Sequence, residues 1–296
     1  MTPTDTVTFG DRAFALLQYL LPKQLMSRAV YALVRSERPW LRNAVLKFFL
    51  RAYRIDMSIA AEPDPYRYST FNAFFTRALR PGARPIAQER DALVSPVDGT
   101  VSQCGPIDQD AILQAKGRNY SLLELLGGDA ERARPYAGGS FATIYLAPYN
   151  YHRIHMPLTG VVRETVYAPG DLFSVNASTA RAVPRVFARN ERVICTFTAL
   201  EDAYDFAMVF VGALHVGSIE TTWCGEINPP PRRKKQTIIV PQGVGATLAK
   251  GAEAGRFNMG STVILLLPPH IAAWSDVMQP GASMQMGQRI GTIVKK

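Results

Sequence analysis

Two histidines stand three residues apart, His152 and His155, within residues 150–157. Only four histidines occur in 296 residues, so this pair concentrates acid–base capacity in one short segment. If the segment is extended, the two imidazoles point to opposite faces and serve different tasks, whereas a turn would let them cooperate. The alternative interpretation is that both are surface histidines in a loop and have no chemical role. His215, within an apolar strand, is expected to be structural, and His270 to be a loop residue.

A carboxylate and a hydroxyl could complete such a site. Asp98 precedes Gly99, a pair typical of turns, and it gains a chemical role only if a nearby imidazole needs an orienting carboxylate. Ser261 follows Gly260 at the start of an apolar run. A Gly-Ser pair alone is weak support for a chemical role of Ser261. Glycine does, however, tolerate strained dihedral angles. With a base nearby, the Ser261 hydroxyl could attack the carbonyl of Gly260.

Metal and nucleotide cofactors are not expected. The histidine pair has no third ligand at a suitable spacing. Cys104, Cys195 and Cys224 are far apart and form no CxxC pair, which argues against a disulfide framework and favours a reducing compartment. No glycine-rich loop of the nucleotide-binding kind occurs.

The elements that must position these residues are mostly short strands. Turns rich in Pro, Gly, Asn and Asp separate them, which predicts an α+β protein with a mainly antiparallel sandwich or barrel-like catalytic domain over residues 63–296. A short helical patch is expected at residues 71–79. Strands are predicted at residues 92–94, 141–146, 160–166, 192–197, 206–211, 216–222, 237–240, 261–267 and 289–294.

Residues 1–62 are predicted to be a helical membrane-docking segment with amphipathic helices at residues 11–21 and 39–56. The second helix carries its apolar stripe at Leu41, Ala44, Val45, Phe48, Ala52 and Ile55. Residues 1–60 hold nine Lys and Arg against four Asp and Glu; with the run at 232–235 they account for the net charge of +9. Basic amphipathic helices with Trp and Tyr suit a bilayer interface. Packing against the rest of the protein is the alternative.

The sequence gives less support to a nucleic-acid partner, to secretion or to a membrane span. The basic residues are interleaved with an apolar stripe and no nucleic-acid-binding motif occurs, so no nucleic acid is expected. Residues 1–10 are polar and lack a basic start, which gives no indication of a secretory signal. No apolar run of about 18 residues occurs, so no transmembrane helix is expected.

Several segments, taken in order, resemble phosphatidylserine decarboxylase of the bacterial type. The match covers nearly the whole chain, and the ordered set is far more specific than any one motif. One departure is Met259, where the family commonly has Leu, and this swap conserves volume. The matching segments are residues 68–77, 97–99, 151–157, 169–176, 187–193, 216–220 and 255–262.

The resemblance implies a self-cleaving proenzyme. By similarity, Ser261 attacks the Gly260 carbonyl, with His155 as general base and Asp98 orienting it, in the logic of a hydrolase triad. Cleavage between Gly260 and Ser261 would give chains 1–260 and 261–296. Ser261 would become a pyruvoyl group, the only cofactor implied.

The resemblance also implies the reaction. The pyruvoyl ketone would form a Schiff base with phosphatidylserine and absorb the electrons released with CO₂, giving phosphatidylethanolamine. His152 is the expected proton donor, and Ser174 and Asn176 the expected headgroup contacts. The substrate implies a peripheral protein on the cytoplasmic side of an anionic cell membrane. A homodimer is compatible with this interpretation.

Two other classes of protein fit the sequence less well. Residues 95–101 and 286–293 also resemble half-motifs of biotinyl and lipoyl carrier domains, but no lysine stands at a hairpin tip. A Ser-His-Asp hydrolase would need a G-x-S-x-G elbow, which is absent around Ser261.

Overall fold

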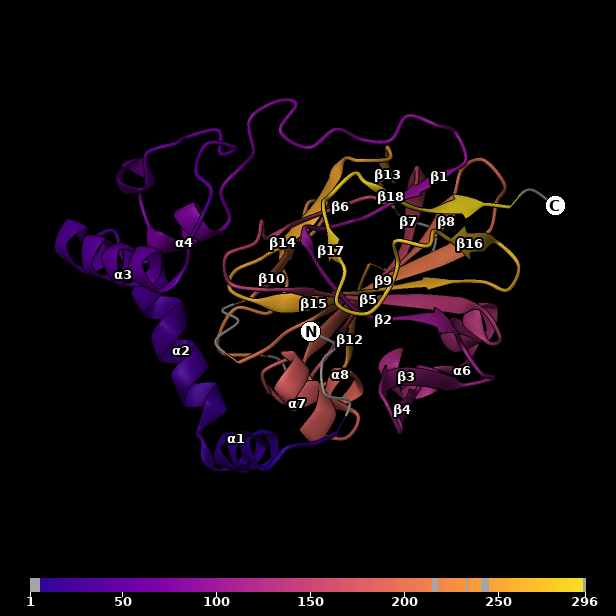
Figure 1. Cartoon of the computed structure of the whole chain (residues 1–296), viewed down its shortest axis with the longest axis horizontal. Coiled ribbons are helices and arrows are strands. Elements are labelled where there is room, and N and C mark those ends of the chain that lie inside the picture. The colour runs from indigo at the N-terminus through magenta and orange to yellow at the C-terminus, as the bar shows by residue number, and fades with distance from the viewer. Residues whose placement is uncertain (1–5, 215–217, 233, 241–244, 295–296) are drawn as a thin grey trace.

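Three helices form an arc along one side of the molecule, and strands fill the rest (Figure 1). The computed structural model describes residues 6–214, 218–232, 234–240 and 245–294. The helices are α1 (Phe9–Leu20), α2 (Lys23–Val34) and α3 (Pro39–Ala52). Thr8 and Asp11 form a capping box that starts α1, and Pro39 occupies the first turn of α3.

The main sheet holds nine strands and is antiparallel throughout. Its order is β12-β7-β8-β9-β15-β5-β2-β17, with β13 pairing β7. The bounds are β2 (Gly99–Pro106), β5 (Ser140–Leu146), β7 (Gly160–Ala168), β8 (Arg192–Ala199), β9 (Asp205–Val211), β12 (Thr237–Val240), β13 (Thr247–Leu248), β15 (Ser261–Leu267) and β17 (Ser283–Met284).

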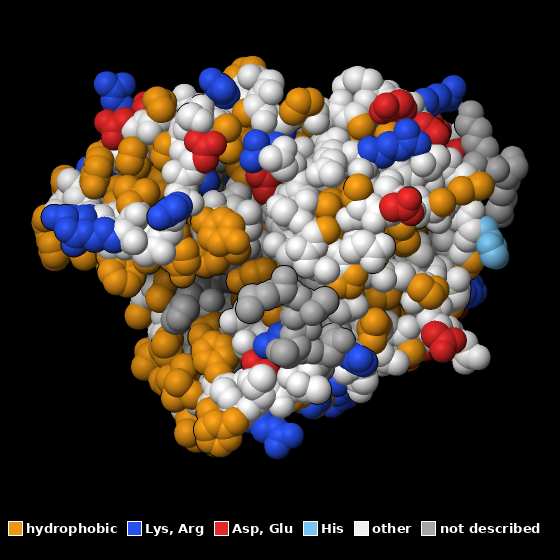
Figure 2. All heavy atoms as spheres, in the orientation of Figure 1, with side chains coloured by type: hydrophobic (Ala, Val, Ile, Leu, Met, Phe, Trp, Pro, Cys, Tyr) orange, Lys and Arg blue, Asp and Glu red, His pale blue; other side chains and the backbone are white. Residues whose placement is uncertain are grey.

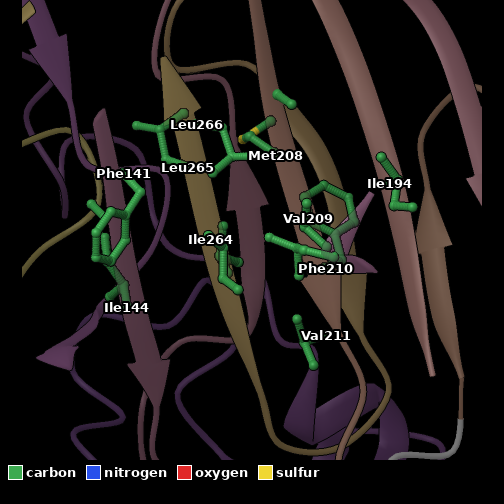
Figure 3. Packing of buried hydrophobic residues seen from close by; sticks show 14 of the residues in the cluster. Phe141, Ile144, Ile194, Met208, Val209, Phe210, Val211, Ile264, Leu265 and Leu266 are labelled. Atoms are coloured by element: carbon green, nitrogen blue, oxygen red, sulfur yellow. The ribbon is translucent and has the colours of Figure 1, made fainter. Parts of the chain in front are cut away.

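Strand β15 lies at the centre of this sheet. It pairs with β5 on one side and β9 on the other, and all seven of its residues are buried. A strand covered on both faces needs a continuous apolar run, which residues 263–267 supply. Figure 3 shows Ile264 and Leu265 packed between Phe141 of β5 and Met208 of β9.

Three smaller sheets complete the strands. Their orders are β1-β18-β16, β11-β10-β14-β6 and β3-β4. The bounds are β1 (Ala92–Val94), β3 (Ala111–Ala115), β4 (Arg118–Ser121), β6 (Arg153–His155), β10 (Ile219–Thr221), β11 (Gly225–Glu226), β14 (Glu253–Phe257), β16 (Ala272–Trp274) and β18 (Arg289–Ile293).

Short helices occupy the connections. They are η1 (Pro65–Arg67), α4 (Phe71–Phe75), α5 (Leu122–Leu125), α6 (Ala130–Ala133), η2 (Arg134–Tyr136), α7 (Ala177–Ala182) and α8 (Val186–Arg189).

The architecture confirms the predicted α+β class, and each predicted strand has a counterpart among the described residues. The predicted strand at 216–222 is shorter, at residues 219–221, and its first two positions and His215 lie outside the described residues. His270 is an exposed turn residue, as expected. Helix α2 was not predicted. Among the described residues, no helix combines the length and apolarity needed to cross a bilayer.

The stripe predicted for the third helix is only partly right. Leu46 and Phe49 are the buried residues of α3, where they pack with the phenylalanines of α4. Ala44 and Phe48 of the predicted stripe are exposed. The helix therefore has two apolar faces, one turned inward and one turned outward.

Candidate active site

Two of the predicted site residues, Ser261 and Asp98, lie at one end of the main sheet. Ser261, the first residue of β15, pairs with Leu146, the last residue of β5. Beside them, Thr100 near the start of β2 pairs with Tyr145 of β5. Gly99 is needed there, because a Cβ on it would lie 2.6 Å from the Tyr145 carbonyl oxygen. Asp98 immediately precedes Gly99.

The backbone before Ser261 is strained. Met259 has a φ of 111° and Gly260 a φ of 24°, so two consecutive residues lie in the region that disfavours side chains. A residue such as Met259 held there costs on the order of 1–3 kcal/mol. Ser261 itself is fully buried, and its Oγ has no hydrogen-bond partner among the described residues. Its hydroxyl is therefore uncommitted beside a strained bond.

His155 is held through both ring nitrogens. Nδ1 lies 2.8 Å from the Gly251 carbonyl oxygen and Nε2 2.9 Å from the Tyr151 hydroxyl. Because a carbonyl only accepts, Nδ1 carries the proton and Nε2 accepts from Tyr151. Burial, partly offset by the Gly251 bond, lowers the pKa of His155. His155 is thus a neutral imidazole with a basic Nε2.

The orienting bond expected from Asp98 to His155 is absent among the described residues. Arg84 binds both oxygens of Asp98, with Nη2 2.6 Å from Oδ2, and the Met286 amide donates to Oδ1. These donors occupy the buried carboxylate, and the Gly251 carbonyl orients His155 instead. Asp98 still acts on His155 electrostatically and raises its pKa slightly against the effect of burial.

His152 occupies a different environment from His155. It is fully buried, its ring stacks on Phe75 with centroids 4.1 Å apart, and Nε2 lies 3.1 Å from the Ala147 carbonyl oxygen. Burial lowers its pKa to about 3, helped by the charge of Arg77. Nδ1 is buried without a partner among the described residues. The two histidines thus have separate surroundings: His155 ends β6, and His152 directly precedes that strand outside any turn, as in the first of the two alternatives.

The two expected headgroup contacts have structural partners. The side chain of Asn176 caps α7 by accepting from the Thr179 amide, and the Ser174 amide donates to Gln18 of α1. These bonds fix the loop against α1. They leave the headgroup role of both residues a prediction.

The N-terminal helices reach the predicted cleavage segment. Met259 packs against the cluster formed by Val34, Leu46, Phe49, Phe71, Phe74 and Phe75. Asn258 accepts from Asn72 and donates to Ser218 Oγ at 2.8 Å. Ser218 bonds Glu226, which binds Arg35 of α2 at 2.6 Å. Helix α2 is therefore tied to the strained segment through side chains.

Sequence reasoning missed several residues here. Tyr151 and Gly251 hold His155, and Arg84 holds Asp98. Phe75 stacks on His152, and the charge of Arg77 lowers the pKa of His152. Tyr151, Phe75 and Arg77 lie within the resembling segments, so the signal was present there, but nothing in a sequence shows which side chains face a histidine. No group of three or more His, Cys, Asp or Glu side chains in the described ranges could hold a metal ion.

The candidate residues are a buried serine hydroxyl after a strained backbone and two buried imidazoles, which are the residue types of a Ser–His nucleophile site. A family model described as phosphatidylserine decarboxylase matches residues 71–292, and another, described as PSD, matches residues 13–54. The chain belongs to the phosphatidylserine decarboxylase family.

Curated relatives agree over nearly the full length. The chain is 49% identical over 282 residues to a phosphatidylserine decarboxylase proenzyme of Ectopseudomonas mendocina, with 95% of this chain and 98% of the relative covered. A protein of the same name from Alkalilimnicola ehrlichii is 53% identical over 256 residues, covering 86% of this chain and 88% of the relative.

Proposed function

We propose that this chain is a proenzyme that cuts itself between Gly260 and Ser261 and then decarboxylates phosphatidylserine at a membrane surface. The observation that carries the proposal is the buried, unpartnered Ser261 Oγ directly after two residues of positive φ. Strain in the backbone before the bond is released by breaking it, and a hydroxyl with no competing partner is ready to attack.

In the first reaction, Ser261 Oγ attacks the Gly260 carbonyl carbon and the peptide C–N bond breaks, leaving an ester and a free amine. His155 Nε2 takes the hydroxyl proton, after exchanging its bond with Tyr151 for one with Ser261. Elimination then breaks the ester and releases the Gly260 carboxylate. Water next hydrolyses the carbon–nitrogen bond at position 261, which releases ammonia and leaves a ketone there. The products are chains 1–260 and 261–296.

The pyruvoyl group so formed would supply the electron sink for loss of CO₂ from the serine headgroup. The site suits a ketone because Ser261 is buried and, among the described residues, no charged group is bound to its oxygen. His152 first accepts a proton at Nδ1, its unpartnered ring atom among the described residues, from the ammonium group of the substrate, and it later returns that proton to the substrate carbon. Phe75 and the Ala147 carbonyl hold its ring in place.

Docking at the membrane rests on α1 to α3. Helix α1 faces the protein with Asp11, Ala15 and Gln18, while its large apolar residues face outward. Asp11 pairs with Arg181, and Gln18 bonds Thr179. This inverts the usual arrangement of a surface helix, which buries its apolar face. The outward residues include Phe9, Leu16, Leu17, Leu20, Leu25, Trp40 and Phe48.

Figure 2 shows these apolar side chains gathered along the arc of the N-terminal helices. An exposed apolar surface beside basic residues suits an anionic bilayer, which would place a lipid headgroup near the site. The basic run at 232–235 contributes less than its sequence suggests, because Arg232 is buried in an ion pair with Glu191, 2.8 Å away. Arg233 lies outside the described residues.

Intact-mass measurement of the purified protein tests the proposal. We expect two chains with the small one blocked at its N-terminus and reducible by borohydride, and phosphatidylethanolamine formed from phosphatidylserine. The Ser261→Ala variant should stay one chain of 32.6 kDa and be inactive. An active wild-type protein in one piece, or an active Ala variant, would contradict the proposal.

A further inference from the structure

Arg77 is a buried cation that has no hydrogen-bond or ion-pair partner in the part of the chain that the structure describes. The residue lies shortly after the end of α4 in the sequence, and it is 3% exposed. Across the described residues, its guanidinium makes neither a hydrogen bond nor an ion pair, and its Nε and Nη1 atoms are fully buried. Its guanidinium carbon lies over the ring of Phe74, 5.5 Å from the centroid, in a cation–π contact.

A buried guanidinium that lacks hydrogen bonds and a counter-charge lowers the stability of the folded protein. Removing a guanidinium from water is unfavourable unless it gains hydrogen bonds and a counter-charge. Burial accordingly lowers the pKa of Arg77. Other buried arginines in this chain are paired: Arg132 binds Glu164 at 2.6 Å, and Arg192 donates to the carbonyls of Leu125 and Glu124. Arg77 therefore retains an unused capacity to bind an anion.

The location of this charge is at the candidate site. Two residues earlier, Phe75 stacks on His152, and the Arg77 charge is one cause of the low pKa of His152. Tyr151 and Asp98 act electrostatically on Arg77 in turn. The intervening backbone is fixed, because the Thr76 carbonyl accepts from Arg153 at 2.9 Å. The position of Arg77 is thus set by bonds that leave its own donors open.

We propose that Arg77 is the anion-binding residue of the substrate site and receives a carboxylate or phosphodiester group of the phosphatidylserine headgroup. This inference rests on the proposed function. A guanidinium offers planar, paired N–H donors that match two oxygens of either group. Binding the anion would satisfy the buried donors, so the unfavourable burial of Arg77 would be relieved only when the headgroup is present.

The experiment compares Arg77→Met and Arg77→Lys with the wild-type protein, and uses Arg80→Met as the control because Arg80 is exposed on the same loop. Self-cleavage is followed by mass, and decarboxylation by kinetics on phosphatidylserine in mixed micelles. Arg77→Met should be cut normally and raise the apparent KM about 10- to 100-fold, the effect of losing hydrogen bonds to a charged group. Arg77→Lys should recover only part of this loss.

A thermal midpoint separates binding from a structural role. Because Arg77 makes no hydrogen bond or ion pair among the described residues, and Met can keep the contact with Phe74, Arg77→Met should not lower the melting temperature of the substrate-free protein, whereas replacing a structural arginine would lower it. Stability retained with binding lost is typical of a residue kept for function.

Two soluble headgroups distinguish the two anions. Inhibition by glycerophosphoserine and glycerophosphoethanolamine is measured for the wild type and Arg77→Met. If Arg77 holds the phosphodiester, the variant weakens both inhibitors equally. If it holds the carboxylate, only glycerophosphoserine is weakened.

A cut, folded Arg77→Met protein with wild-type KM and inhibition would overturn this inference. If the Met variant does not fold, a cut Arg77→Lys protein decides, and an unchanged KM there also overturns it. Failure of the wild type itself to be cut or to act would refute the proposed function instead, so the two failures are distinct.

Discussion

At the scale of single residues, burial rather than a neighbouring carboxylate sets the protonation state of both histidines. His152 and His155 are neutral in the folded chain because the interior disfavours imidazolium. The Gly251 carbonyl fixes the tautomer of His155, and the Ala147 carbonyl fixes that of His152. Two imidazoles close in sequence can therefore hold separate roles in cleavage and in decarboxylation.

The low pKa of His152 predicts an acid-sensitive fold. Between its folded pKa of about 3 and the ordinary value of 6.5, the unfolded chain takes up a proton that the folded chain does not. Stability should therefore fall as pH drops below about 6.5, by up to about 1.4 kcal/mol per pH unit from this group. Thermal midpoints between pH 7.5 and 5 measure it, and His152→Gln should show a shallower decline. Equal slopes would contradict the prediction.

The roles of the histidines separate by variant. His152→Ala should still be cut, because His152 does not hold the base position, but it should lose decarboxylation. Mass and product assays on the same sample check this. An uncut His152→Ala protein that is folded would mean that the division of roles is wrong.

At the scale of elements, the N-terminal helices have two functions in one segment. Their inner residues support the site, because Met259 packs with Leu46 and Phe49, and Arg35 is tied through Glu226 to the cleavage segment. Their outer residues are apolar and exposed. Deleting residues 1–60 would release the protein from vesicles but also uncover the α4 phenylalanines, so point variants of the outer face are the sharper test.

The double variant Trp40→Ser with Phe48→Ser should weaken binding to anionic vesicles. These side chains are 68% and 74% exposed, so the fold loses little, while burial of two aromatic rings in lipid is lost. Co-sedimentation should fall at least roughly tenfold. Leu113→Ser, an exposed apolar residue on β3, is the control. Unchanged co-sedimentation of the double variant would count against docking through α3.

At the scale of the whole molecule, the predicted cut separates two chains that the sheets hold together. Residues 261–296 begin with β15, which pairs along its length with β5 and β9, and include β18, which pairs with β1 and β16. The apolar residues of β15 are fully buried. Cleavage at residue 260 breaks one bond at the edge of this core and leaves the core itself intact.

The two chains should therefore migrate as one species under native conditions and separate only in denaturant. Size-exclusion chromatography with light scattering measures this, and the same mass shows whether the protein is a monomer or the homodimer with which the sequence is compatible. A small chain that elutes alone without denaturant would be incompatible with β15 as a central strand.

Much of the fold could be predicted from sequence, because alternation and apolar runs report directly on burial. The strand predicted at 261–267 has those bounds in the structure, and the helix predicted at 39–56 is present but ends at residue 52. Helix α2 was missed because Ser27 is buried and Leu25 exposed, so its pattern does not mark an ordinary amphipathic face. The stripe of α3 was incomplete for a similar reason, since that helix is apolar on two sides.

The sequence by itself determined the α+β class, the ordered motifs of the family and the identities of Asp98, His152, His155 and Ser261 as candidates. Only the tertiary structure decided their partners: Arg84 for Asp98, Gly251 and Tyr151 for His155, and Phe75 for His152. It also left Arg77 buried, with no hydrogen bond or ion pair to any residue that the structure describes. The reason is physical: hydrogen bonds, burial and strain depend on residues far apart in the chain, and only folding brings these residues together.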